Sequence, residues 1–237
     1  MKSIEFALQG GRMTVGIVRV GDTVRRPIST DRTLVHELLR HAEAEGFEGT
    51  PRFLGIDDEG REILSFLPGN VPADLGFYSD GELFAAAALL RRFHDMSVRF
   101  ITRQELSGEV FCHNDWGPPN AVFRDGLPYG IIDFDTVVPG MRLWDVGYSA
   151  FAWLDLGNPD FTGREQVRRL SIFAEGYGHP FLSVADIAAY AVARQSALVV
   201  SGRVNHNPEM REWAAAAVDW TVLNVLELVL PTGYRLK

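Results

Sequence analysis

The sequence has almost no lysine. Of its 23 basic residues, only Lys2 and Lys237 are lysines, and both stand at the ends of the chain. Any contact with a phosphate that lysine usually makes must therefore be made by arginine, whose planar guanidinium binds two oxygens at once. A general drift from lysine to arginine explains the same composition, and the two interpretations are compatible.

Cysteine and long apolar runs are equally scarce. Cys112 is the only cysteine, which excludes an intramolecular disulfide framework and suits a reducing cytoplasm. No apolar run follows Met1 and Lys2 as it would in a signal peptide, and no run is long enough to span a bilayer. We therefore expect a cytoplasmic protein without a membrane partner.

Basic residues are outnumbered by acidic ones. The 31 acidic residues leave a net charge of −8, which argues against nucleic acid as a partner and permits a cationic substrate. The acidic residues are spread along the chain, so solvation of the surface explains them better. A length of 237 residues and a hydrophobic content of 46% are typical of a soluble enzyme with one large domain or two apposed lobes.

The order of the predicted elements indicates an α+β protein. In the first part we predict strands at 4–8, 14–20 and 23–26, a helix after Asp31 that ends near Gly46, and strands at 53–56 and 62–67. In the second part we predict helices at 81–96, 143–156, 164–176, 184–201 and 208–230, with strands at 109–112, 121–123 and 129–134. The segment Leu67–Pro68–Gly69–Asn70 breaks regular structure, so we place a boundary between lobes 1–69 and 70–237.

Three oxygen-bearing side chains stand at fixed intervals in the middle of the chain. Asp115 and Asn120 lie five residues apart in one loop, and Asp133 follows thirteen residues later at the end of an apolar strand. In kinases, the first such residue deprotonates a hydroxyl, and the other two hold the metal that bridges nucleotide phosphates. A single loop Asp is more often a turn residue, but the two intervals together favour the catalytic interpretation.

Asp135 extends this set of oxygen ligands. If the strand remains extended, Asp135 points to the same side as Asp133, because alternate residues share a face. Carboxylate and amide oxygens are the ligands that Mg²⁺ prefers. The sequence therefore predicts a magnesium site at Asn120, Asp133 and Asp135.

The chain resembles the aminoglycoside phosphotransferase and choline kinase-like branch of the protein-kinase fold. The segments His113–Asn120, Ile131–Asp135 and Gly140–Gly147 carry the resemblance. It implies a two-lobed fold with a small antiparallel-sheet lobe and a mainly helical lobe. It also implies that Asp115 is the catalytic base, that Asn120 and Asp133 bind Mg²⁺, and that His113 and Asp145 support the loop, Asp145 by accepting backbone hydrogen bonds.

The first lobe matches the family less closely. Gly10–Gly11–Arg12 resembles the turn that covers nucleotide phosphates, although an ordinary hairpin turn looks the same. The family's strand lysine corresponds to Arg25, or to Arg26 if the register slips by one. Val35 occupies the place of its glutamate partner, which leaves Glu37 as the nearest carboxylate.

Two further sets of residues are candidates for ligand contacts. Ser65, Phe66 and Leu67 would form the hinge that meets the adenine, unless Phe66 and Leu67 are merely core. The candidates for an acceptor pocket are Trp153, Asp155, Asp160, Glu175, Trp213 and Asp219.

The resemblance implies transfer of the γ-phosphate of ATP or GTP, through Mg²⁺, to a hydroxyl of a small molecule such as an aminoglycoside or similar antibiotic, by a monomer or homodimer. The missing lysine and the uncertain glutamate keep a second function open, that of a non-catalytic kinase-like binding or toxin-immunity protein. A third, metal-dependent hydrolysis at Asp133 and Asp135, lacks the further His or carboxylate clusters that such sites need.

Overall fold

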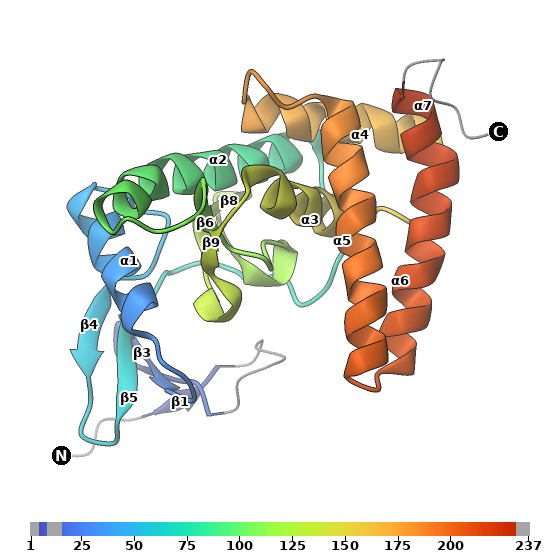
Figure 1. Ribbon diagram of the computed structural model, residues 1–237. Coiled ribbons are helices and arrows are strands. Elements are labelled where there is room, and N and C mark those ends of the chain that lie inside the picture. The colour runs from blue at the N-terminus through green and yellow to red at the C-terminus, as the bar shows by residue number, and fades with distance from the viewer. Residues whose placement is uncertain (1–4, 9–15, 231–237) are drawn as a thin grey trace.

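A five-stranded antiparallel sheet and one helix form the first part of the protein (Figure 1). The computed structural model describes residues 5–8 and 16–230. The strand order is β1-β2-β3-β5-β4. The elements are β1 (Phe6–Ala7), β2 (Val18–Val20), β3 (Thr23–Pro27), α1 (Thr33–Ala44), β4 (Phe53–Ile56) and β5 (Arg61–Ser65).

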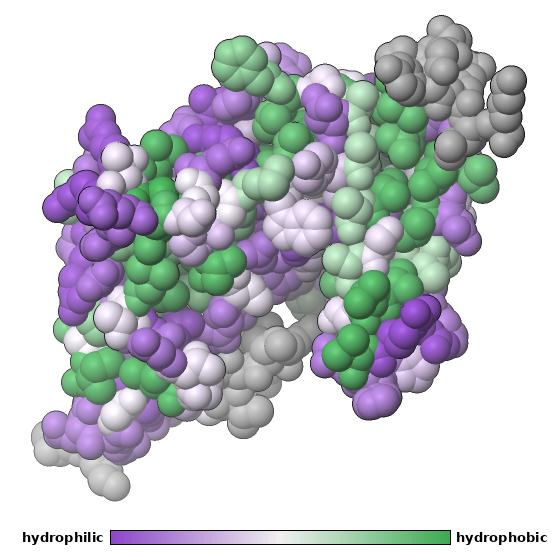
Figure 2. All heavy atoms as spheres, viewed as in Figure 1, coloured by the Kyte–Doolittle hydropathy of each residue, from purple (hydrophilic) through white to green (hydrophobic). Residues whose placement is uncertain are grey.

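The second part is mainly helical and carries two small two-stranded sheets, β6–β9 and β7–β8. Its elements are α2 (Asp80–Arg103), β6 (Val110–Cys112), β7 (Ala121–Arg124), β8 (Leu127–Ile131), β9 (Val138–Gly140), α3 (Arg142–Leu154), α4 (Gly163–Tyr177), α5 (Val184–Val204), α6 (Pro208–Thr221) and α7 (Glu227–Val229). On the face shown in Figure 2, a notch separates the strand-rich part from the lower end of the α5–α6 pair.

This architecture confirms the predicted fold class, with small differences at the ends of elements. Helix α2 begins as predicted, because Ser79 and Glu82 form a capping box, but it continues to Arg103. The predicted helix 208–230 is interrupted by a π-helical segment, Val222–Leu226, and β9 was not predicted. The strand predicted at 129–134 ends at Ile131, which changes the geometry of Asp133.

The chain passes from the first part to the second at Gly69 and Asn70. Asn70 and Phe123 exchange backbone hydrogen bonds of 3.0 and 2.7 Å, which attaches Asn70 to the β7–β8 hairpin. A Cβ on Gly69 would lie 2.3 Å from the carbonyl oxygen of Phe123, so only glycine allows this approach. The lobe boundary at 69 and 70 stays a prediction.

The register of β3 and β5 determines which arginine faces the second part. Arg26 lies opposite Glu62, and Arg25 lies opposite Ile63. Neighbouring residues of a strand point to opposite faces. Arg26 is therefore buried between the two parts, whereas Arg25 points to the other face of the sheet, where it contacts Thr23 and Asp57.

Helix α3 packs most closely against α5 at Gly147. A Cβ on Gly147 would lie 2.6 Å from the backbone carbon of Tyr190. The absence of this side chain lets α5 pack directly against the backbone of α3. No helix in the described part of the chain has the length and apolar composition needed to cross a membrane.

Replacing Gly147 should separate α3 from α5. We expect Gly147→Ala to lower the free energy of unfolding by about 1–3 kcal/mol, the usual cost of overpacking. The matched control is Gly81→Ala in α2, where a Cβ meets no atom within 4 Å. This control should be neutral or up to about 1 kcal/mol more stable. Urea denaturation of both variants checks the prediction, and equal stabilities would contradict it.

Candidate active site

Asp115 lies in a rigid loop between β6 and β7. Its Oδ2 accepts a 2.8 Å hydrogen bond from the Asn120 amide, which also donates to the Asp115 carbonyl at 2.7 Å. The hydroxyl of Tyr148, on α3, donates to Oδ1 of Asp115. Pro118 and Pro119 fix the path between Asp115 and Asn120 as one turn of 3₁₀-helix. Two donors therefore orient the carboxylate.

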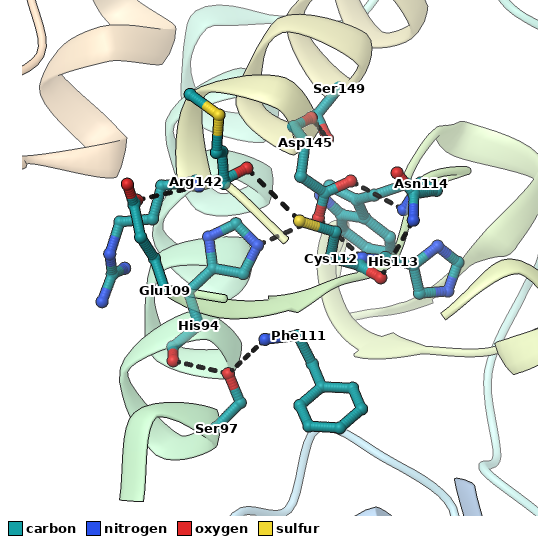
Figure 3. Close-up of polar contacts among 12 residues, drawn as sticks. His94, Ser97, Glu109, Phe111, Cys112, His113, Asn114, Arg142, Asp145 and Ser149 are labelled. Atoms are coloured by element: carbon teal, nitrogen blue, oxygen red, sulfur yellow. Dashed lines mark hydrogen bonds and ion pairs between the residues drawn. The ribbon is translucent and has the colours of Figure 1, made fainter. Parts of the chain in front are cut away.

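Asp145 holds the start of this loop (Figure 3). It is completely buried at the N-terminal end of α3. Its two oxygens accept hydrogen bonds of 2.7 Å from the backbone N–H groups of His113 and Asn114. Burial alone would raise the pKa of Asp145, but bonds from His94 and His113 outweigh it and keep the pKa below the ordinary value.

His94 supports Asp145 from α2 in its neutral form. Its Nε2 lies 2.9 Å from Asp145, and its Nδ1 lies 2.7 Å from the Tyr177 hydroxyl. Arg142 donates to the oxygen of Tyr177 at 3.1 Å, so the Tyr177 proton is directed to Nδ1 of His94. Burial lowers the pKa of His94, which agrees with a neutral ring that donates from Nε2.

His113 connects the loop to the segment that carries Asp133. The ring is buried, its Nε2 donates to the carbonyl of Ile132 at 3.0 Å, and it packs edge-on against Phe134. Asp133 then adopts a left-handed conformation (φ 64°), and residues 134–136 form a 3₁₀ turn. The extended strand assumed for Asp133 and Asp135 is thus wrong, because β8 ends at Ile131.

Both carboxylates nevertheless converge on Arg26. Its Nη2 lies 3.3 Å from Asp133 and also contacts Asp135. The other oxygen of Asp135 accepts a 2.6 Å hydrogen bond from Arg32, which precedes α1. Asp135 therefore lies among guanidinium groups, whereas the sequence predicted it among metal ligands. Burial acts to lower the pKa of Arg26, but the bond to Asp135 reverses this and raises it.

Glu62, on β5, forms ion pairs with both Arg26 and Arg32. It is completely buried and lies 3.3 Å from Arg26, 3.1 Å from Arg32 and 2.8 Å from His36. The sequence favoured Arg25 paired with Glu37. In the structure Arg26 forms an ion pair with Glu62, because these two residues are opposite each other in the sheet.

A cavity of about 400 Å³ lies beside these charges. Among the residues that line it are Arg26, Arg32, Ser65, Phe66, Leu67, Asn120 and Asp133, with Val24, Leu64, Val122 and Ile132 as apolar walls. The structure thus brings the predicted hinge next to two of the predicted metal ligands. Gly10, Gly11 and Arg12 lie outside the described residues.

Asn120 and Asp133 are suited to hold Mg²⁺. The Asn120 amide N–H is used by Asp115, which leaves its carbonyl oxygen for another partner. Burial and the charge of Asp135 raise the pKa of Asp133 although Arg26 opposes them, so a further cation at this carboxylate would be stabilising. Hard oxygens of these two kinds match the preference of Mg²⁺.

Two of the residues predicted for an acceptor pocket have other partners in the structure, and the prediction for the set stays untested. Trp153 is completely buried in the core, and Asp155 accepts a hydrogen bond from Asn158. Tyr148, on α3, and Arg194, on α5, lie beside the loop instead. No motif marked them, although Tyr148 stands one helical turn after Asp145 and shares its side of α3.

Comparison with known proteins gives matches in sequence and in fold. The phosphotransferase enzyme family model matches residues 102–192, which contain the loop and Asp145. The trifolitoxin immunity protein of Rhizobium leguminosarum bv. trifolii is 32% identical over 197 residues, which cover 73% of this chain and 74% of that protein.

Solved structures share the fold at low sequence identity. Choline kinase LicA from Streptococcus pneumoniae aligns over 91% of this chain and 94% of its own, with a TM-score of 0.56 and 14% identity. The aminoglycoside phosphotransferase APH(2″)-IIa, in complex with gentamicin, aligns over 89% of both chains, with a TM-score of 0.53 and 14% identity. Both neighbours share the two-lobed, protein-kinase-like fold.

Acid should destabilise the protein through His94. The lowered pKa means that the folded protein binds fewer protons at this ring than the unfolded chain, whose histidine has an ordinary pKa of 6.5. Unfolding free energy should therefore fall as the pH drops below about 6.5, with a slope approaching about 1.4 kcal/mol per pH unit. Denaturant titrations of wild type and His94→Gln from about pH 7 to about pH 5 test this. Equal slopes in the two proteins would contradict it.

Proposed function

Because the chain belongs to the aminoglycoside phosphotransferase and choline kinase-like family, we propose that it transfers the γ-phosphate of ATP or GTP to a hydroxyl of a small molecule. Asp115 accepts the proton of that hydroxyl, and Asn120 and Asp133 hold Mg²⁺. When bound, Mg²⁺ would neutralise phosphate charge. Residues 1–69 then form the nucleotide-binding lobe, and residues 70–237 form the catalytic and acceptor-binding lobe.

One observation supports this function above all. A single cavity is lined by the hinge Ser65–Leu67, the cation Arg26, and the oxygen ligands Asn120 and Asp133. Asp115 contacts one of these ligands, since its Oδ2 lies 2.8 Å from the Asn120 amide nitrogen. A nucleotide whose purine ring meets the hinge would therefore direct its phosphates toward the metal ligands and toward the catalytic base, Asp115. This is the arrangement that phosphoryl transfer requires.

Arg26 performs the phosphate-binding role of the missing lysine. Its guanidinium already lies between the carboxylates of Glu62, Asp133 and Asp135. Glu62 anchors it at the sheet, while a nucleotide would compete with Asp133 and Asp135 for its outer face. Arginine suits this role because it binds an anchor and a phosphate with different edges of the same planar group.

Removing the base should remove turnover. We expect Asp115→Asn to lower kcat by about 10²–10⁴-fold, the usual contribution of a general base. The matched control is Asp125→Asn, an exposed residue of the β7–β8 turn, which should leave kcat unchanged. Nucleotide consumption measured across a panel of anionic, neutral and cationic alcohols gives the rates. Undiminished turnover in Asp115→Asn would refute the assignment.

The adjacent arginines provide a second test. Arg26→Met should weaken nucleotide binding by about 10–100-fold, because charge-assisted hydrogen bonds are lost. Arg25→Met should leave it unchanged, since Arg25 contacts Thr23 and Asp57 on the other face of the sheet. Calorimetric titration with MgATP and MgGTP measures both. The absence of binding to wild type at millimolar nucleotide would refute a nucleotide-dependent function.

A second candidate function is toxin immunity, favoured by the 32% identity to the trifolitoxin immunity protein. This function requires no phosphotransfer if the chain protects by binding the toxin. Expression of wild type or Asp115→Asn in trifolitoxin-sensitive bacteria separates the alternatives. Equal protection by both indicates binding, protection by wild type alone indicates phosphotransfer, and the absence of protection contradicts this candidate.

A further inference from the structure

Arg194 reaches the catalytic loop from the middle of α5. Its Nη2 donates a 2.8 Å hydrogen bond to the carbonyl oxygen of Asn114, the residue that precedes Asp115. The close packing of α5 on Gly147 makes this reach possible. Arg194 therefore lies on the α3–α5 side of the loop.

Two aromatic rings hold the guanidinium in place. Its central carbon lies 4.6 Å from the ring centre of Trp144 and 4.8 Å from that of Tyr148. Tyr148 also donates its hydroxyl to Asp115. The cation is thus one side chain away from the candidate base, and the stacking fixes its orientation without supplying a negative charge.

The charge of Arg194 has no direct counterion. Among the residues that the structure describes, no carboxylate forms an ion pair with it, and its Nε is buried without a hydrogen-bond partner. The contrast with Arg26 and Arg32 is clear, since each of them contacts Glu62 and Asp135. A half-buried cation in this state is costly, and an anion supplied by a ligand would remove that cost.

We propose that Arg194 binds an anionic group of the acceptor, a carboxylate or a phosphate monoester, and so orients the reacting hydroxyl toward Asp115. This rests on the proposed phosphotransferase function. The positive charges of a polycationic acceptor would be repelled by Arg194, because they would lie closer to it than the screening length of the solvent. The net charge of −8 does not offset this, because charges spread over the surface are screened beyond about 8–10 Å.

A set of compounds with one diol skeleton tests the proposal. Glycerate carries a carboxylate, glycerol phosphate a phosphate, glycerol no charge, and aminopropanediol a cation. Each is added to wild type, Arg194→Met and Arg203→Met in the presence of saturating MgADP, which occupies the site at Arg26. Arg203 is the matched control, because it is an exposed arginine in the last turn of the same helix.

The thermal midpoint Tm is the readout, because MgADP has no γ-phosphate to transfer and the compounds are compared by binding alone. We expect glycerate, glycerol phosphate or both to raise the Tm of wild type and Arg203→Met by about 2–4 °C and to have no such effect on Arg194→Met. The compound that raises the Tm, glycerate or glycerol phosphate, identifies the anionic group as a carboxylate or a phosphate. Glycerol and aminopropanediol should have no effect. Arg194→Gln, which keeps a donor for the Asn114 carbonyl, replaces Arg194→Met if that variant does not fold.

Three results would overturn the inference. These are stabilisation by aminopropanediol as large as by the anions, equal stabilisation of Arg194→Met by the anions, and no stabilisation of wild type by either anion. The proposed function fails separately, if MgADP and MgATP do not bind at all. In that case the charge preference at Arg194 is measured without nucleotide and still decides whether an anion binds there.

Discussion

The buried carboxylate of Asp145 is the constraint on which the candidate site depends. It uses both oxygens to hold consecutive backbone N–H groups, those of His113 and Asn114. A loop that carries a base must otherwise lose considerable conformational entropy when it binds substrate. In this protein the loop is already ordered before substrate binds, because Asp145 on α3 holds it and a neutral His94 on α2 supports Asp145. The position of Asp115 therefore follows from the packing of two helices rather than from the loop itself.

A second cluster links the two parts of the molecule. Arg26 and Arg32, from the strand-rich part, contact Asp135, which follows β8 in the helical part. Glu62 holds both arginines from inside the sheet. With Asp133, which also contacts Arg26, three carboxylates face two guanidiniums, so the charge of this cluster is nearly balanced before any ligand binds. A nucleotide would add negative charge and a metal positive charge, so a metal that binds with the nucleotide would offset part of the charge that the phosphates bring to this cluster.

The sequence predicted the fold class and most of the catalytic loop because these depend on local patterns. Helical and strand periodicity, the Ser79 cap and the spacing of Asp115, Asn120 and Asp133 can all be recognised without long-range contacts. Glu62 could not be found in this way. It opposes Arg26 only because β3 pairs with β5 in one register, and a shift of one residue would present Arg25 instead. The contact of Arg194 with Asn114 could not be predicted for a similar reason, since eighty residues of sequence separate the two.

Cations lie both at the cavity and at the catalytic loop. Arg26 lines the nucleotide cavity, and Arg194 holds the carbonyl of the residue before Asp115. A phosphoryl group in transfer carries negative charge on its equatorial oxygens, while Asp115 must stay ionised to accept a proton. Under the proposed function, a cation beside the transferred phosphoryl group would stabilise that negative charge, because Coulomb interactions are strong where water is excluded. Under the proposed function these charges would oppose a cationic acceptor, so the groups that assist phosphotransfer would also select which molecule can receive the phosphate.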